Sequence, residues 1–460
     1  LTTAGADESF NLGNGENQRR VYYSLFRSDY LLPSVDRNVS GPAPATRRFF
    51  DIADGDVDPL WRDLIYGLDF CGPDPDPATD CSLLPGERDR AKDVINWVHR
   101  VKTAEDPNNL GTYFNYILGD FFHSDPLVYG NPDEFEYWVA DVEGSGTLPL
   151  DDPCDASPDG YRCFFAKQRY RRKVIFAGTN DGQVHAFDAG FFRGDNGEAT
   201  GVCKTNPVSS DQFVVGDFDN GTGRELFSYI PRSIMPKLES LSLASDHAYT
   251  VDGRIARGDV FIDPVQSSGA PDPDGRQWRS MLVGTLREGG SGLYGLDITQ
   301  PDKLNNCQGY EQIPQARTGS LDYVPSCSDG GIDCGPTAYP AVMWEFDDTS
   351  ECVWNLANTP AQPMNDPFRV RVGVPDYELK KCDDDANGLP DLAYSWSQPN
   401  LGRIRVDDSV TGEIVDKYVA IFGGGMDPDP IRKSMTPAGG AVGGNFLFMV
   451  DVETGRAIYK

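Results

Sequence analysis

Residues 172–188 read RKVIFAGTNDGQVHAFD, and this stretch decides the fold. The apolar run 174–177 predicts a strand, and the alternating residues 184–188 predict a second one directly after it. Between them, Asn180, Asp181 and Gly182 tolerate the positive φ angles that a tight turn requires. The stretch therefore predicts a β-hairpin with few spare residues.

The same arrangement recurs twice downstream. Residues 280–285 and 418–422 each form an apolar run that leads into a glycine-rich connection, followed by a second strand that ends at Asp297 or Asp451. Repeated hairpins of this kind indicate radially arranged four-stranded sheets. We therefore predict a mainly β protein, a β-propeller with modified, insertion-rich blades. The repeats lie roughly 100 residues apart, well above the ~40–50 residues of regular propeller repeats, so the blades must carry large insertions.

Several stretches in the same order resemble the propeller domain of the PilY1/PilC family of type IV pilus tip proteins. They include LGDFFHSDP (118–126), FAGTNDGQVHAFDAG (176–190), HAYTVDG (247–253), YSWSQPNLGRI (394–404) and FLFMVDVETG (446–455). The resemblance covers roughly residues 95–460. It implies an extracellular protein, exported through the periplasm, at the pilus tip or cell surface. It further implies a role in pilus assembly and in adhesion to surfaces or host cells, with a conformation tuned by calcium. The implied partners are minor pilins or the pilus tip, and a surface or host receptor.

The chain divides into two regions. Residues 1–115 predict an irregular and helical segment, in which 87–102 has apolar residues at helical spacing, and residues 116–460 predict the blades. The strands after residue 172 suffice for roughly four blades, whereas the family's propeller needs about seven. We therefore expect a propeller that is incomplete in this chain, either because the chain is a fragment or because a second chain completes it.

Charge and cysteine content narrow the function classes. The net charge of −30 repels nucleic acid and anionic lipid, and an acidic surface also keeps a secreted protein soluble. No run of ~18 apolar residues exists, so membrane insertion is not expected. The ten cysteines suit disulfides in an oxidising compartment. Their spacing suggests these pairs: Cys71–Cys81, Cys154–Cys163, Cys203–Cys307, Cys327–Cys334 and Cys352–Cys382.

The sharpest local motif is an acidic loop at 383–391, DDDANGLPD. Its register matches the first nine positions of an EF-hand-type loop, in which hard oxygen ligands alternate and Gly388 makes the sharp turn. Tyr394 stands at position 12, where a bidentate glutamate is usual. The motif predicts a calcium site, and the alternative is a solvated acidic turn. The predicted ligands are Asp383, Asp385, Asn387, Leu389 through its carbonyl group, and Asp391.

Other motifs carry weaker signals. The triplet 193–195, Arg-Gly-Asp, lies in a polar stretch that we expect to be a displayed turn, whereas the second triplet, 257–259, lies between strands and is expected to be structural. The four histidines lack metal-ligand spacing, and His185 and His247 are expected to bond within the blades. No catalytic motif is present, so we expect no enzyme. The alternatives are a secreted propeller enzyme resembling quinoprotein dehydrogenases, or a structural component of an extracellular filament.

Overall fold

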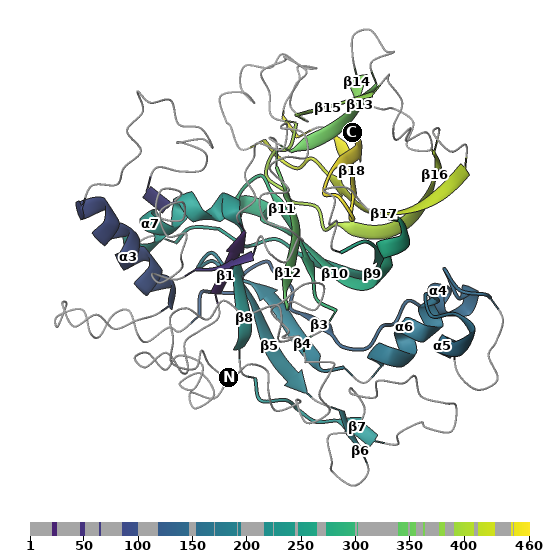
Figure 1. The fold of residues 1–460 in the computed structure, drawn as a ribbon. Coiled ribbons are helices and arrows are strands. Elements are labelled where there is room, and N and C mark those ends of the chain that lie inside the picture. The colour runs from purple at the N-terminus through teal and green to yellow at the C-terminus, as the bar shows by residue number, and fades with distance from the viewer. Residues whose placement is uncertain are drawn as a thin grey trace.

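The structure of the chain is a computed structural model. It describes residues 21–24, 47–50, 64–65, 85–99, 118–146, 153–169, 171–190, 192–194, 216–223, 225–243, 247–264, 273–299, 301, 339–347, 350–355, 362–363, 377–381, 391–408, 413–427, 443–444 and 446–460. These residues form a mainly β molecule with three four-stranded antiparallel sheets, which we number in chain order (Figure 1).

Sheet 1 contains the predicted hairpin. Its four strands follow the spatial order β8-β5-β4-β3, and β1 and β2 extend it beyond β8. Gly182, at the hairpin turn, has a φ of +92°, and a Cβ atom there would lie 2.7 Å from the side chain of Leu238, so the turn requires glycine. The strands of sheet 1 and of the small β6–β7 ribbon beside it are β1 (Val21–Ser24), β2 (Arg47–Phe49), β3 (Leu127–Tyr129), β4 (Lys173–Gly178), β5 (Val184–Gly190), β6 (Phe192–Gly194), β7 (Gly216–Phe218) and β8 (Glu225–Ile230).

Sheets 2 and 3 confirm the two downstream repeats. Each is an antiparallel meander in which the predicted hairpin forms the two central strands. A further ribbon joins sheet 3, because β13 pairs with β19 in parallel and with β14 and β15 antiparallel. The strands are β9 (Ile255–Ile262), β10 (Gln277–Thr285), β11 (Leu293–Asp297), β12 (Ala341–Phe346), β13 (Glu351–Asn355), β14 (Gln362–Pro363), β15 (Tyr377–Lys381), β16 (Asn400–Asp408), β17 (Glu413–Gly423), β18 (Leu447–Asp451) and β19 (Ala457–Tyr459).

The helices lie at the edges of the sheets. The predicted helix at 87–102 is confirmed in its described part as α3, whose apolar residues Ala91, Val94, Ile95 and Val98 are buried. It lies beside α7 in Figure 1, and Arg90 pairs with Glu239 across the contact at 2.5 Å. The α-helices are α3 (Pro85–His99), α4 (Phe135–Ala140), α5 (Pro153–Ala156), α6 (Tyr161–Gln168) and α7 (Met235–Leu243), and the short 3-10 helices are η4 (Arg232–Ile234), η5 (Pro273–Gly275) and η6 (Arg287–Gly289).

The sheets stack with sheet 2 in the middle. Successive residues of a strand point to opposite faces, so β10 sends Leu282 into a core shared with sheet 1 and sends Met281 and Val283 into a core shared with sheet 3. Burying one such leucine side chain contributes on the order of 2 kcal/mol. The middle sheet therefore holds both neighbours, and its loss would expose both cores.

The far face of sheet 3 is less covered. It carries a small apolar cluster in which Val406, Val419 and Ile458 are buried while Ile421 and Met449 are only partly buried. The described residues hold three complete four-stranded sheets. The strands β13, β14 and β15 form a ribbon on sheet 3 and not a four-stranded sheet of their own.

Candidate functional site at the seams between the sheets

The contacts between neighbouring sheets repeat along the chain. We call the residues that lead into the first strand of a sheet its approach segment, which is 118–126 for sheet 1, 247–254 for sheet 2 and 391–399 for sheet 3. The approach segments of sheets 2 and 3 each insert a hydroxyl side chain into the hairpin turn of the preceding sheet. We call each such contact a seam.

The seam between sheets 1 and 2 is built around Thr250. The Thr250 N–H group donates to Asn180 Oδ1 at 3.1 Å, and the Thr250 hydroxyl donates to the Thr179 carbonyl oxygen at 3.1 Å. The same hydroxyl accepts a hydrogen bond from the Gly182 N–H group at 3.0 Å. Thr250 is fully buried, so each of these polar groups depends on the others for its partner.

The seam between sheets 2 and 3 is built around Ser395 in the same way. Its N–H group donates to the Gly290 carbonyl oxygen at 3.2 Å, and its hydroxyl donates to the Gly292 carbonyl oxygen at 2.8 Å. The Leu286 N–H group donates to the same hydroxyl at 3.0 Å. Thr250 and Ser395 each stand five residues before the first strand residue of their sheet, which is Ile255 or Asn400. The two seams are therefore one repeated structure.

A second repeat lies inside each sheet and consists of a buried ion pair. An aspartate at or near the end of the third strand accepts a hydrogen bond from the backbone N–H two residues later, at 3.2 Å for Asp188, 2.9 Å for Asp297 and 3.0 Å for Asp451. Each carboxylate also pairs with a cation from the second strand or the residue before it. We call these pairs clamps, and they are Arg172–Asp188 at 2.6 Å, Arg279–Asp297 at 2.5 Å and Lys417–Asp451 at 2.7 Å.

The strand register fixes the clamp. In every sheet the cation stands two residues before the strand residue that pairs with the aspartate, which is Val174, Met281 or Val419. The sequence analysis found the aspartates but missed their cations. The signal was present, since a basic residue stands one or two positions before each apolar run, at 172, 279 and 417, but it becomes visible only when the three hairpins are aligned.

The predicted calcium loop leads directly into the approach segment of sheet 3. Four of its predicted ligands, Asp383, Asp385, Asn387 and Leu389, lie outside the described residues. Asp391 is described and buried, and its Oδ2 atom accepts a hydrogen bond from the Lys460 ammonium group. The Oδ1 atom is also buried and has no hydrogen-bond partner in the described part of the chain. One carboxylate oxygen thus remains for a further ligand.

His185 bonds within sheet 1, as the sequence analysis expected, whereas His247 bonds to the approach segment of sheet 1 and not within a sheet. His185 is fully buried, with Nδ1 2.6 Å from Glu225 Oε1 and Nε2 3.0 Å from Thr179 Oγ1. Burial alone would lower the pKa of the His185 imidazole, but the carboxylates of Asp181 and Glu225 raise it. His247 Nε2 lies 3.0 Å from Asp120 Oδ2 on a more exposed surface.

The Arg-Gly-Asp triplets differ from each other as follows. Asp259 of the second triplet is buried in β9 and accepts hydrogen bonds from Tyr161 at 2.6 Å and from Ser280 at 2.6 Å, so its structural role is confirmed. In the first triplet, Arg193 and Gly194 belong to strand β6 and pair with β7, which corrects the expectation of a turn at these two positions. Asp195 lies outside the described residues.

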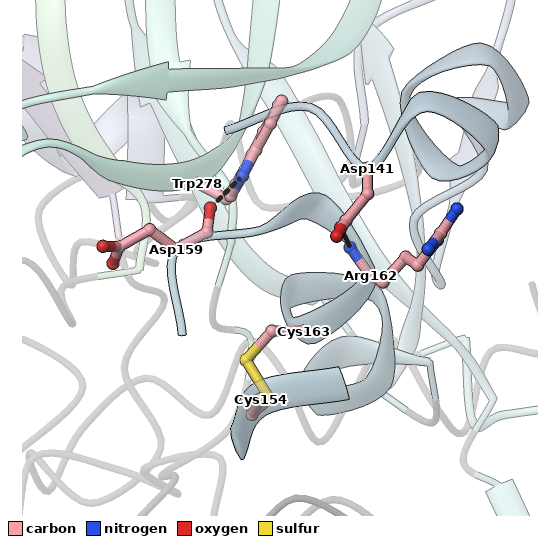
Figure 2. Close-up of a disulfide and its surroundings, with 6 residues drawn as sticks. All are labelled: Asp141, Cys154, Asp159, Arg162, Cys163 and Trp278. Atoms are coloured by element: carbon pink, nitrogen blue, oxygen red, sulfur yellow. Dashed lines mark hydrogen bonds between the residues drawn. A yellow bond between two sulfur atoms is a disulfide. The ribbon is translucent and has the colours of Figure 1, made fainter. Parts of the chain in front are cut away.

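One of the predicted disulfides is described. Cys154 and Cys163 are bonded, with a Cα–Cα distance of 4.6 Å, and they join α5 to α6 in the insertion between β3 and β4 (Figure 2). In each of the other four predicted pairs, at least one cysteine lies outside the described residues. The insertion is fastened to sheet 2, because the Trp278 indole N–H donates to the Asp159 carbonyl oxygen at 2.8 Å, as Figure 2 shows.

The insertion also presents apolar side chains to solvent. Phe135 and Trp138 on α4 stack with ring centroids 6.5 Å apart, and the exposed fraction of Phe135 is 72%. Arg162 holds the end of α4, donating from Nε to the Trp138 carbonyl oxygen at 2.9 Å and from Nη2 to the Val139 carbonyl oxygen at 2.8 Å. The sequence analysis missed this surface, because a helix this short has no clear apolar periodicity.

The described residues contain no group of three or more histidine, cysteine or acidic side chains placed to hold a metal ion. None of the described helices is long and apolar enough to cross a membrane. The polar side chains at the seams and clamps bond to neighbouring segments of the same chain.

Comparison with known proteins decides the family. The chain is 31% identical over 189 residues to a type IV pilus biogenesis factor PilY1 homolog of Xylella fastidiosa, a match that covers 41% of this chain and 11% of that protein. It is 24% identical over 337 residues to the type IV pilus biogenesis factor PilY1 of Pseudomonas aeruginosa strain UCBPP-PA14, covering 70% of this chain and 24% of that protein. The chain is a distant homologue of the PilY1 family. No family model matches it.

The chain spans only a tenth to a quarter of the length of these PilY1 relatives. Among solved structures, the crystal structure of the Pseudomonas aeruginosa PilY1 C-terminal domain matches 72% of this chain and 35% of that chain, with 17% sequence identity and a TM-score of 0.32. The two sequence relatives confirm the resemblance inferred from the stretches between 118 and 455 at the level of the PilY1 family.

Proposed function

We propose that this chain is part of an extracellular, pilus-associated protein that supports type IV pilus biogenesis and adhesion to surfaces or host cells. The observation that carries the proposal is the match over 337 residues to a type IV pilus biogenesis factor. The Cys154–Cys163 disulfide supports an oxidising location outside the cytoplasm. The partners that we propose are minor pilins or the pilus tip, and a receptor on the colonised surface.

The three sheets act, in this proposal, as consecutive blades of a β-propeller. They share one strand order, stack face to face around two separate cores, and repeat the seam at Thr250 and Ser395. Propeller blades have four antiparallel strands each and contact their neighbours through their faces. The partly covered far face of sheet 3 suits a further blade, from this protein or from a second chain.

Calcium tuning is the second part of the proposal. Asp383, Asp385, Asn387, the Leu389 carbonyl group and Asp391 have the spacing of an EF-hand-type loop, and Asp391 still has one buried oxygen for a further ligand. A bound calcium ion would supply the positive charge that these carboxylates share. Asp391 stands four residues before Ser395. Order in the loop would therefore favour insertion of Ser395 into the hairpin turn of sheet 2.

We propose a binding role in preference to an enzymatic one. The polar cluster around Asp259 and the cluster around His185 are buried, and their side chains bond to neighbouring strands. Such clusters hold a scaffold in place, whereas catalytic groups must face a cleft that admits a substrate.

Deleting the gene from the bacterium that carries it tests the pilus role. We expect fewer surface pili by negative-stain microscopy and weaker attachment, both restored by the wild-type gene. Normal piliation and attachment in the deletion strain would contradict the proposal.

Calorimetric titration of the chelator-stripped protein with calcium tests the loop. We expect saturable binding that Asp385→Ala abolishes and that Glu136→Ala, which removes an exposed acid on α4, leaves unchanged. Unchanged binding in Asp385→Ala would refute the loop assignment, and the absence of binding in the wild-type protein would make the loop an ordinary acidic turn.

A further inference from the structure

The approach segment of sheet 1 differs from the other two in what it exposes. Phe122 stands five residues before Leu127, the first residue of β3, which is the position that Thr250 and Ser395 occupy in their own sheets. Thr250 and Ser395 are 0% and 1% exposed, whereas Phe122 is 59% exposed and its neighbour Phe121 is 42% exposed. Large apolar side chains that are exposed side by side indicate a contact surface.

The alignment of the three approach segments has independent support. The Ser124 hydroxyl donates to the Gly178 carbonyl oxygen at 2.5 Å. The Ser397 hydroxyl donates to the Gly423 carbonyl oxygen at 3.3 Å. Gly178 and Gly423 are the last residues of β4 and β17, the second strands of their sheets. Ser124 stands three residues before β3, and Ser397 stands three residues before β16. Phe122 and Ser395 are therefore equivalent in the structure as well as in their sequence distance from the strand.

Each inserted hydroxyl side chain lies between two hairpin turns, that of the preceding sheet and that of its own sheet. The approach segment of sheet 1 contacts the hairpin turn of its own sheet, since the Asn180 N–H group donates to the Asp120 carbonyl oxygen at 3.1 Å. On the side away from that turn, the Phe122 ring lies near three other aromatic rings, those of His123 at 4.1 Å, Tyr249 at 5.7 Å and His247 at 6.5 Å between ring centroids.

The opposite end of the three-sheet array carries a complementary surface. The hairpin turn of sheet 3 follows β17, and it is flanked by Met426, which is 40% exposed, and Leu447, which is 50% exposed. In sheets 1 and 2 the corresponding turn is covered by the approach segment of the next sheet. The array thus ends in an exposed apolar approach segment on one side and, on the other, in a hairpin turn with the exposed apolar side chains of Met426 and Leu447 at its described ends.

We infer that the Phe122 surface, made of Phe121, Phe122, His123 and Tyr249, is the docking surface for the hairpin turn of a further propeller blade of the same protein. The inference rests on the proposed propeller. A phenyl ring cannot form the hydrogen bonds of Thr250 or Ser395, so the contact must be apolar. The docked turn therefore carries apolar side chains beside a glycine-rich bend, as the turn of sheet 3 does with Met426 and Leu447.

Hydroxyl-radical footprinting on the full protein purified from its bacterium tests this inference. Phe122 and Phe135 have the same intrinsic reactivity and similar exposure in the three-sheet array, so Phe135 is the matched control. We expect Phe122 to be oxidised severalfold more slowly than Phe135, at all protein concentrations. Equal oxidation rates would overturn the inference, and protection that appears only at high protein concentration would overturn it in favour of a second copy.

Amide hydrogen exchange in the same sample separates this inference from the propeller on which it rests. Slow exchange at Thr250 and Ser395 together with an oxidised Phe122 would leave the seams intact and refute only the docking surface. Fast exchange at both seams would refute the propeller itself. The pilus role is tested separately by the gene deletion and does not depend on either result.

Discussion

The two seams place a hydroxyl side chain at the same position but bond it differently. At the seam between sheets 1 and 2, the Thr250 N–H group donates to the side-chain amide oxygen of Asn180. The Glu345 carboxylate adds a second link between these sheets, because it accepts hydrogen bonds from the Tyr229 hydroxyl and the Arg232 N–H group. At the seam between sheets 2 and 3, Ser395 uses backbone groups, and the Arg287 guanidinium lies 4.3 Å from the Trp396 ring centroid.

In the proposed function, the difference separates a permanent contact from an adjustable one. The first seam is supported from both sides by side chains on regular strands and by the core that α3 and α7 complete. The second seam follows directly in sequence on the acidic loop at 383–391, where we propose that calcium binds. Regulated segments tend to come from the less stable parts of a fold.

The clamp of the middle sheet should give the largest effect, because sheet 2 takes part in both seams. Arg279→Ala leaves the Asp297 carboxylate buried without its cation, and we expect the free energy of unfolding to fall by about 3–5 kcal/mol. Urea unfolding followed by circular dichroism measures it. Arg405→Ala is the control, since Arg405 is 74% exposed and also pairs with an aspartate, Asp416. A loss of stability in the control as large as in Arg279→Ala would contradict the clamp.

The seam hydroxyls should give a smaller effect that separates the two seams. Thr250→Val leaves the Gly182 N–H group buried without its partner, and Ser395→Ala does the same to Leu286, so each should cost about 1–3 kcal/mol. Ser240→Ala, on the exposed surface of α7, is the control. We expect Ser395→Ala to lower the free energy of unfolding by less when chelator is present, whereas the loss caused by Thr250→Val stays constant. Equal calcium dependence at both positions would remove the distinction between the seams.

The first seam should also depend on pH. Burial raises the pKa of the Glu345 carboxyl from 4.5 to about 7, against the opposing effect of its hydrogen bonds from Tyr229 and Arg232. Between these two pH values the folded protein retains a proton that the unfolded chain has lost, so the free energy of unfolding falls as pH rises through this window. Glu345→Gln should flatten this dependence in thermal unfolding scans. A variant with the wild-type slope would show that another group is responsible.

The smallest effect is expected at the exposed face of α4. Phe135→Ser removes a side chain that is 72% exposed, so the free energy of unfolding should stay within about 0.5 kcal/mol of the wild-type value. Urea unfolding checks this, and a substantial loss would mean that Phe135 is covered in the full protein. Phe135 would then be unsuitable as the exposed reference in the footprinting of the Phe122 surface.

The sequence analysis succeeded where the signal is local. The hairpin at 172–188, the terminal aspartates Asp297 and Asp451, and the Cys154–Cys163 pair all depend on residues close together in the chain. The helix α3 was found for the same reason, because its apolar spacing lies within 15 residues.

The missing parts depend on contacts between distant residues. The cation of a clamp can be assigned only once the strand register is known, and the partner of Thr250 lies about 70 residues earlier in another sheet. The grouping of the later strands into sheets could not be predicted, because a strand such as β13 looks the same in sequence whether it starts a new sheet or joins an existing one. The exposed face of α4 was missed because exposure is set by tertiary packing.

Amide hydrogen exchange with and without calcium tests the central claim most directly. The account predicts that adding chelator speeds exchange at Ser395 and at Leu286, whose N–H group donates to the Ser395 hydroxyl, and leaves exchange at Thr250 and Gly182 unchanged. Equal changes at both seams, or no change at either, would contradict the claim that calcium adjusts one seam of a pilus-associated propeller while the other stays fixed.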